Sequence, residues 1–219
     1  MSCDESESPA DAPPGARGPG GAPVLCVDLD GTLLATDVLR ESLLELLRRR
    51  DRALLFLPLW LLQGRARLKR EIARRVSLDP AGLPYNQPLL DFLRREKAAG
   101  RRIVLATASD RAVVDGIARH LGLFAEVLAS DGRVNLAGRN KLDALLRRFG
   151  AGRFDYVGNA AVDLAIWREA NAAIVVTSSR RLLARVRDVV EVRQVFPIPP
   201  GSSQRPLFEA LRLRLKARR

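Results

Sequence analysis

The stretch Val24-Leu25-Cys26-Val27-Asp28-Leu29-Asp30-Gly31-Thr32 decides the fold of this chain. Its first four residues are apolar, and such a run before a carboxylate is typical of a buried parallel strand. The carboxyl end of that strand would bring Asp28 to the open edge of a sheet, which is where ligands bind in open α/β sheets. Two carboxylates two residues apart, followed by Gly-Thr, suit a site where one acid attacks and the other moves a proton. Taken alone, Asp28 and Asp30 also fit a strand that ends in an acidic turn.

Beyond residue 86 the chain alternates between strand and helix patterns. Apolar runs predict strands at 102–106, 126–129, 154–157, 172–176 and 189–196. Amphipathic spacing predicts helices at 87–99, 110–121, 140–149, 161–170 and 180–187. This alternation indicates an α/β fold with a Rossmann-like parallel sheet and helices on both of its faces.

A block of helical patterns interrupts this alternation after the first strand. Residues 38–49, 53–63 and 66–76 predict three helices, and Leu83-Pro84-Tyr85-Asn86 breaks the pattern. We interpret 38–85 as a small α-helical cap inserted over the carboxyl edge of the sheet, with 24–37 and 86–200 as the catalytic core. Residues 1–23 are rich in Ser, Pro, Gly and Ala and predict a disordered tail, whereas 201–219 predict a basic amphipathic segment.

The net charge indicates which kinds of partner this protein can bind, and the cysteine content indicates its cellular compartment. The net charge is +12, and residues 1–23 carry −3, so the remainder carries +15. Such a balance favours phosphorylated substrates, acidic membrane surfaces or nucleic acid. We expect no nucleic-acid partner, because the sequence shows no zinc finger, RNP-like aromatic motif or helix-turn-helix. Two cysteines without a disulfide framework, no signal peptide and no apolar run of about 20 residues predict a cytoplasmic protein.

Three further segments carry polar groups to the ends of predicted strands. Thr107 follows one strand, and its hydroxyl together with backbone N–H groups at Ala108 could hold phosphate oxygens. Lys141 begins a helix, where on its own it would be a solvated lysine. Gly158-Asn159-Ala160-Ala161-Val162-Asp163 follows another strand and offers oxygen ligands for a hard cation.

Together these motifs resemble those of the haloacid dehalogenase-like superfamily, most of whose members are Mg²⁺-dependent phosphatases. The resemblance implies that Asp28 is the nucleophile of an aspartyl-phosphate intermediate and Asp30 the general acid and base, with Thr107 and Lys141 as further catalytic residues. The implied phosphate-binding residues are Gly31, Thr32, Thr107, Ala108 and Lys141. The implied Mg²⁺ ligands are Asp28, Asp30 through its carbonyl, Asn159 and Asp163.

The chain departs from the superfamily pattern at Asn159, where the pattern has Asp. An amide oxygen can still bind Mg²⁺ but brings no negative charge. We therefore expect weaker metal binding and weaker catalysis than in a relative with Asp at this position.

Several short segments resemble one subgroup, the N-terminal phosphatase-like domain of fusion proteins with a UbiA-type polyprenyl-phosphate prenyltransferase. These segments are Arg-Glu-Ser-Leu-Leu at 40–44, Leu-Pro-Leu-Trp-Leu-Leu at 57–62, Leu-Pro-Tyr-Asn at 83–86 and Tyr-Val-Gly-Asn at 156–159. The resemblance implies a polyprenyl-linked sugar phosphate as substrate and a UbiA-type prenyltransferase as partner. Two segments suggest a peripheral position on the inner face of the membrane: the apolar residues 53–62, which basic residues flank, and 206–219, in which apolar residues lie among arginines and a lysine. Alternatively, 53–62 is a packed cap helix and 206–219 a solvated tail.

Three functions therefore remain open. The first is Mg²⁺-dependent hydrolysis of a phosphomonoester such as a polyprenyl-linked sugar phosphate. The second is hydrolysis of a small soluble phosphomonoester, as in phosphoserine phosphatase-like relatives. The third is a weakly active or inactive accessory domain of a membrane prenyltransferase system, which the substitution at Asn159 and the basic tail suggest.

Overall fold

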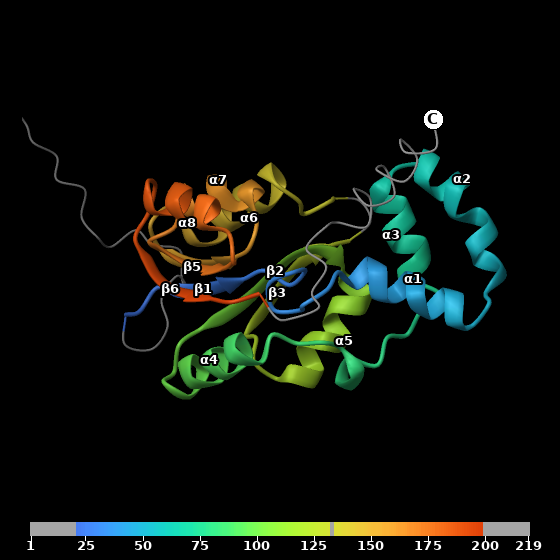
Figure 1. Ribbon diagram of the computed structural model, residues 1–219, viewed down its shortest axis with the longest axis horizontal. Helices are drawn as coiled ribbons and strands as arrows, with labels where there is room; N and C mark the ends of the chain where they lie inside the picture. Colours follow the sequence, from blue (N-terminus) through green and yellow to red (C-terminus); the bar gives the residue numbers. More distant parts are fainter. Residues whose placement is uncertain (1–20, 132–133, 199–219) are drawn as a thin grey trace, which may run out of the picture.

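A six-stranded parallel sheet forms the centre of the molecule (Figure 1). The computed structural model describes residues 21–131 and 134–198. The strand order is β3-β2-β1-β4-β5-β6, and every neighbouring pair is parallel. The strands are β1 (Val24–Val27), β2 (Ile103–Asp110), β3 (Glu126–Ser130), β4 (Phe154–Gly158), β5 (Ala172–Val176) and β6 (Val192–Phe196). The predicted Rossmann-like α/β sheet is confirmed.

Helices cover both faces of the sheet, and alternate residues of the strands pack against them. Leu25 and Val27 point to the face covered by α4 (Gln87–Ala98) and α5 (Arg111–Leu121). Val24 and Cys26 point to the opposite face, where α6 (Arg139–Phe149), α7 (Leu164–Glu169) and α8 (Arg180–Arg187) lie. All four of these β1 side chains are fully buried, as the continuous apolar run predicts for a central parallel strand.

A separate helical layer projects from the carboxyl side of the sheet. It consists of α1 (Val38–Arg48), the 3₁₀ helix η1 (Arg52–Phe56), α2 (Leu57–Leu62) and α3 (Arg65–Ala73). These elements enclose a core of their own, which contains Leu39, Leu46, Ala53, Trp60, Leu68, Ile72 and Val76. The chain returns through η2 (Pro80–Gly82) to Leu83, which packs in the core beside the sheet. We call residues 38–76 the cap; the division into a core and a cap at 38–85 stays a prediction.

Element boundaries differ from the predicted ones where local hydrogen bonding intervenes. The predicted helix 53–63 is divided into η1 and α2, with Pro58 in the first turn of α2, where its missing N–H costs no hydrogen bond. The predicted strand 189–196 begins only at Val192, because the N–H groups of Val189 and Val190 still bond to the carbonyl of Val186 in α8. The predicted tails lie largely outside the described residues, which begin at 21 and end at 198. Within the described part, no helix is long and apolar enough to span a bilayer.

Candidate active site

Three neighbouring strands deliver the predicted motifs to one edge of the sheet. Val27 of β1 lies level with Leu105 of β2 and Val157 of β4, so the residues after them emerge side by side. Asp28 follows β1 directly, and its N–H bonds to the Val157 carbonyl at 3.0 Å. Only 8% of Asp28 is exposed. The sheet register therefore holds one buried carboxylate between the two other polar segments.

The Asp28 carboxylate accepts hydrogen bonds on both oxygens. Lys141 Nζ, in the first turn of α6, lies 2.6 Å from Asp28 Oδ1. Thr32 Oγ1 donates to Asp28 Oδ2 at the longer distance of 3.3 Å. Only 5% of the surface of Lys141 is exposed. Burial lowers the pKa of Lys141, but the charges of Asp28 and Asp163 outweigh this effect and the net pKa is raised. The lysine is thus held as a cation beside Asp28.

The turn after Asp28 is tight and depends on a glycine. Gly31 has a φ of 72°, in the left-handed region, and its N–H bonds to the Thr36 carbonyl at 2.9 Å. A β-carbon at residue 31 would also overlap the side-chain amide nitrogen of Asn159. Gly31 is therefore needed both for the backbone conformation and for the close approach of Asn159.

Asp30 is held at the junction of β2 and the cap. Its Oδ1 accepts from the N–H of Val38, the first residue of α1, at 2.8 Å. Its Oδ2 accepts from Ser109 Oγ at 2.6 Å and, at the limit of a hydrogen bond, from Thr107 Oγ1 at 3.5 Å. Burial of the carboxyl group, together with the nearby charges of Asp37 and Asp28, raises its pKa to about 6 despite the hydrogen bonds from Ser109 and Val38.

Asp163 receives three hydrogen bonds from the loop after β4 and from β4 itself. Its Oδ2 accepts from the N–H groups of Asn159 at 3.2 Å and Ala160 at 3.0 Å. Its Oδ1 accepts from the Tyr156 hydroxyl at 3.3 Å, and that hydroxyl accepts from Lys141 Nζ at 3.3 Å. Burial and the charge of Asp28 raise the pKa of Asp163 to about 6, although Lys141 and the two N–H groups lower it.

The Asn159 side chain bridges two of the motifs. Its Nδ2 donates to the Gly31 carbonyl at 2.9 Å, which a carboxylate in this position could not do. Because the nitrogen faces Gly31, the amide oxygen remains available as an acceptor or ligand. The departure from Asp thus ties the turn after β1 to the loop after β4 through a neutral hydrogen bond.

The donor set fits a hard divalent cation with few protein ligands. Asp28, Asp30 and Asp163 place three carboxyl groups around one cation, Lys141, so the cluster carries more acid than base. In the described residues no three His, Cys, Asp or Glu side chains converge as a ready metal cage. Mg²⁺ needs no such cage, because it binds through one or two carboxylates and keeps several waters. Oxygens of Asp28, Asp163 and Asn159 are of the type that it prefers.

All nine predicted site residues lie at this edge, and three further residues join them. The structure places Gly31, Thr32, Thr107 and Ala108 around Asp28 and Asp30. Our sequence analysis did not single out Ser109 or Tyr156 and assigned no role to Lys69. Lys69 of α3 donates to the Ala108 carbonyl at 3.1 Å and so links the cap to the last part of β2. The sequence did hold a signal for two of them, because alternate residues of a strand share one face. Ser109 lies two residues after Thr107, and Tyr156 lies two before Gly158.

Comparison with known proteins agrees with this geometry. A model of the family described as haloacid dehalogenase-like hydrolase matches residues 25–168. The uncharacterized protein y4nM of Sinorhizobium fredii (strain NBRC 101917 / NGR234) is 40% identical over 177 residues, which are 80% of this chain. The chain spans only 34% of the length of that relative.

Two solved structures are similar in fold. A phosphoserine phosphatase in its apo form superposes with a TM-score of 0.51 at 14% identity, covering 87% of this chain and 98% of that one. A HAD family hydrolase, t0658, from Salmonella enterica serovar Typhi gives a TM-score of 0.53 at 16% identity, covering 80% of this chain and 68% of that one. At these identities the likeness concerns the fold alone. The family match covers well over half of the sequence, and the chain therefore belongs to the haloacid dehalogenase-like hydrolase family.

Proposed function

We propose that the chain is a Mg²⁺-dependent phosphomonoester hydrolase that forms an aspartyl-phosphate on Asp28. The observation that carries the proposal is the surrounding of Asp28, which lies at the end of β1, 2.6 Å from a buried lysine and two residues from a second carboxyl group. A carboxylate nucleophile needs a nearby cation to accept an anionic phosphate, and a neighbouring acid to protonate the leaving group. Family membership supports the same reaction class.

The proposed reaction has two displacements at phosphorus. In the first, an Asp28 oxygen attacks, the bond from phosphorus to the substrate oxygen breaks, and Asp30 gives its proton to the departing alcohol. In the second, Asp30 takes a proton from water and the water oxygen attacks phosphorus. The bond between phosphorus and the Asp28 oxygen breaks, which restores the Asp28 carboxylate and releases inorganic phosphate. The hydrogen bonds from Ser109 and from the N–H of Val38 hold the Asp30 carboxyl group in position for both transfers.

The remaining residues are proposed to hold the phosphoryl group. Thr107 and Lys141 stabilise charge on its oxygens, together with backbone N–H groups near Gly31, Thr32 and Ala108. When bound, Mg²⁺ would supply positive charge that reduces repulsion between the nucleophile and the phosphate. Its ligands would be Asp28, the Asp30 carbonyl, Asn159 and Asp163.

Two substrate classes follow from different observations. The resemblance of segments 40–44, 57–62, 83–86 and 156–159 to prenyltransferase fusion proteins supports a polyprenyl-linked sugar phosphate, with a UbiA-type prenyltransferase as partner. The fold shared with phosphoserine phosphatase supports a small soluble phosphomonoester instead. Comparing turnover of phosphoserine with that of a polyprenyl-phosphate sugar separates the two, since a lipid-specific enzyme would leave phosphoserine intact.

One feature favours a second function, that of a weakly active accessory domain. Asn159 replaces a carboxylate and is engaged with the Gly31 carbonyl, so the site has one anionic ligand fewer than the superfamily pattern implies. This candidate and the hydrolase differ in a single measurable quantity, the rate of Mg²⁺-dependent turnover.

The deciding experiment is hydrolysis of an aryl phosphate by the native chain and by Asp28→Asn, with and without Mg²⁺. Asp91→Asn is the matched control, because Asp91 is an exposed partner of Arg94 on α4, away from the site. We expect Mg²⁺-dependent turnover that Asp28→Asn abolishes and Asp91→Asn leaves unchanged. Equal turnover by Asp28→Asn and the native chain would rule out Asp28 as nucleophile, and no turnover by any form would favour the accessory domain.

A further inference from the structure

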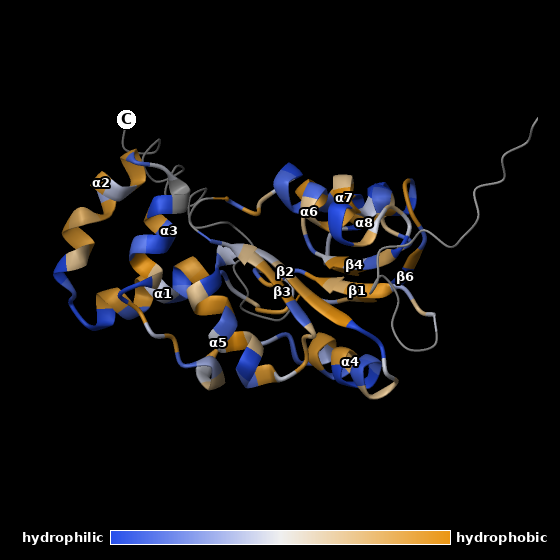
Figure 2. Ribbon diagram, turned by 180° about the vertical axis from the view of Figure 1, so that it is seen from behind, coloured by the Kyte–Doolittle hydropathy of each residue, from blue (hydrophilic) through white to orange (hydrophobic). Residues whose placement is uncertain are grey.

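The cap exposes a group of large apolar side chains at its outer end. These residues, which we call the cap patch, are Leu47, Leu55, Phe56, Leu59 and Leu62, with 61%, 80%, 51%, 50% and 86% of their surface exposed, respectively. Outside the cap, the large apolar residues of the described chain with at least half of their surface exposed are two valines, Val134 and Val162. Figure 2 shows the apolar colouring of α2 at the edge of the molecule farthest from β6.

The local fold explains why these side chains face outward. Leu55, Leu59 and Leu62 are spaced by four and three residues along η1 and α2, so they share one face of this helical segment. Ala53 and Trp60 occupy the other face and are buried in the cap core. Trp60 is further held by Phe56, whose ring stacks on it, and by the Arg75 guanidinium, 4.6 Å from the ring centre. The cap patch residues are therefore not needed to fill the cap core, and they face outward.

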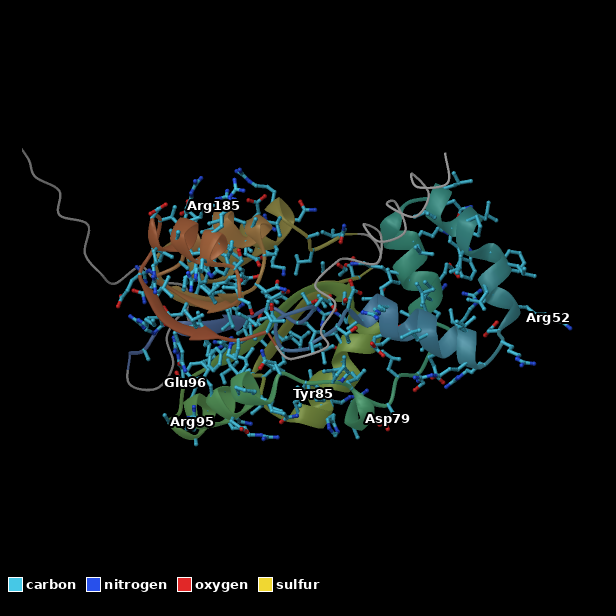
Figure 3. The ribbon with its side chains drawn as sticks, in the orientation of Figure 1. Arg52, Asp79, Tyr85, Arg95, Glu96 and Arg185 are labelled. Carbon is cyan, nitrogen blue, oxygen red and sulfur yellow. The ribbon has the colours of Figure 1, made fainter. Side chains whose placement is uncertain are left out.

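The cap that carries this patch is strongly basic. Residues 38–76 contain eleven Arg and Lys against four Asp and Glu, and so carry a formal charge of +7 within a chain whose total is +12. Arg48 and Arg49 both lie near Glu45, which can balance only one of them. Arg52 lies at the outer edge of the cap, beside the start of η1 (Figure 3).

We propose that the cap patch docks onto an anionic lipid surface. Apolar side chains beside arginines are the combination that enters the boundary between headgroups and acyl chains, while the arginines meet lipid phosphates. An apolar patch of this kind on a soluble domain marks an interaction site. A second copy of this chain is the poorer occupant, because two caps that each carry a formal charge of +7 would repel each other. This inference is independent of the proposed phosphatase activity.

The test is co-sedimentation of the full chain with vesicles of phosphatidylcholine, with or without 30 mol% phosphatidylglycerol, at about 0.1 M salt. The test variant is the triple substitution Leu55→Ser, Leu59→Ser and Leu62→Ser, which leaves the buried cap residues untouched. The matched control is Val134→Ser with Val195→Ser, which removes exposed apolar side chains outside the cap. Residues 199–219 are present in every protein, so any binding through them is common to all and cancels in the comparison.

We expect the native chain and the control to sediment with the anionic vesicles. The partition coefficient of the triple variant should be lower by about tenfold or more. Arg50→Gln with Arg52→Gln should also reduce binding to anionic vesicles, and added salt should weaken the native chain in the same way. Equal partitioning of the native chain and the triple variant overturns the proposal. Absence of vesicle binding by the native chain also overturns the proposal. In that case, a dimer in sedimentation velocity that is lost in the triple variant would identify a second copy of the chain as the occupant.

Discussion

Buried acid groups lie near the start of strand β4 and just beyond its end, and they differ in the number of cations that pair with them. Near its start, the fully buried Asp155 accepts from Arg101 at 2.5 Å, from Arg193 at 2.8 Å and from Asn171 at 2.6 Å. Beyond its other end, Asp163 lies with Asp28 and Asp30 in a cluster where Lys141 is the cation bonded to Asp28. One carboxylate thus has two cations, whereas three carboxyl groups share one.

This difference separates a structural cluster from a chemical one. Where buried charges are fully paired and hydrogen-bonded, neither partner is left uncompensated in the interior, and removal of one partner is costly. An excess of buried acid instead raises pKa values and leaves a demand for positive charge, which a cation or a proton can meet. The pKa values of about 6 for Asp30 and Asp163 are that signature at the carboxyl end.

The largest expected effect comes from breaking the paired end. Asp155→Ala removes the fully buried acceptor that Arg101, Arg193 and Asn171 share, although Arg101 keeps its ion pair with Glu96. Because three hydrogen bonds to a buried carboxylate are lost together, we expect a loss of about 3–5 kcal/mol in the free energy of unfolding. Denaturant titration measures this, with Asp91→Ala as the exposed control. A loss below about 1 kcal/mol would show that the Asp155 cluster adds little to stability.

At the chemical end, Lys141→Met removes the cation next to the proposed nucleophile. We expect aryl-phosphate turnover to fall about 100- to 1000-fold, since a preorganised charge in a buried site contributes on that scale. Lys97→Met, on the exposed side of α4, is the control for loss of a lysine charge. Turnover within about threefold of the native rate would remove Lys141 from the proposed mechanism.

Replacing Asn159 with aspartate tests whether the charge balance at the carboxyl end controls metal binding. Asn159→Asp loses the hydrogen bond to the Gly31 carbonyl and adds a fourth acid, so we expect a loss of about 1–2 kcal/mol without metal. Mg²⁺ should restore this stability and raise the melting temperature of the variant more than that of the native chain. The same Mg²⁺ titration of Asn171→Asp, which lies at the paired end, should show no such gain. An equal response of Asn159→Asp and the native chain would argue against a metal ligand at this position.

The smallest effect concerns a carboxylate at the edge of the sheet. Glu126 begins β3 and bonds to Arg148 and Arg102; burial raises its pKa, but these bonds outweigh burial and the net pKa lies below the usual 4.5. A lowered folded-state pKa means that its stabilising contribution is present above about pH 4.5 and is lost as the pH falls through the folded value. The stability difference between the native chain and Glu126→Gln should therefore shrink from about pH 6 to about pH 3. A stability difference that is constant with pH would contradict this expectation.

Much of the fold and the site could be predicted from the sequence because strand periodicity and short motifs are local. The run 24–27 indicated a buried strand, and the end of the predicted strand 154–157 indicated where Asn159 would emerge. Thr107 was predicted to follow a strand that ends at 106, but it lies within β2, because pairing with β3 resumes at Asp110. Residues whose roles depend on distant partners carried no comparable signal. Ser109 is adjacent to a motif, yet its bond to Asp30 spans 79 positions of the chain. Asp155 sits among apolar strand residues, and its arginine partners come from positions 101 and 193.

The sequence by itself determined the parallel α/β sheet, the helical insertion after the first strand and the family to which the chain belongs, because each follows from neighbouring residues. Only the tertiary structure decided how charge is distributed among them: which acid receives two arginines, which acids share Lys141, and that the Asn159 amide faces the Gly31 carbonyl. It also decided that the apolar run after Arg52 leaves one face uncovered. The physical reason is that pairing and burial depend on distances across the fold, which the order of residues along the chain does not set.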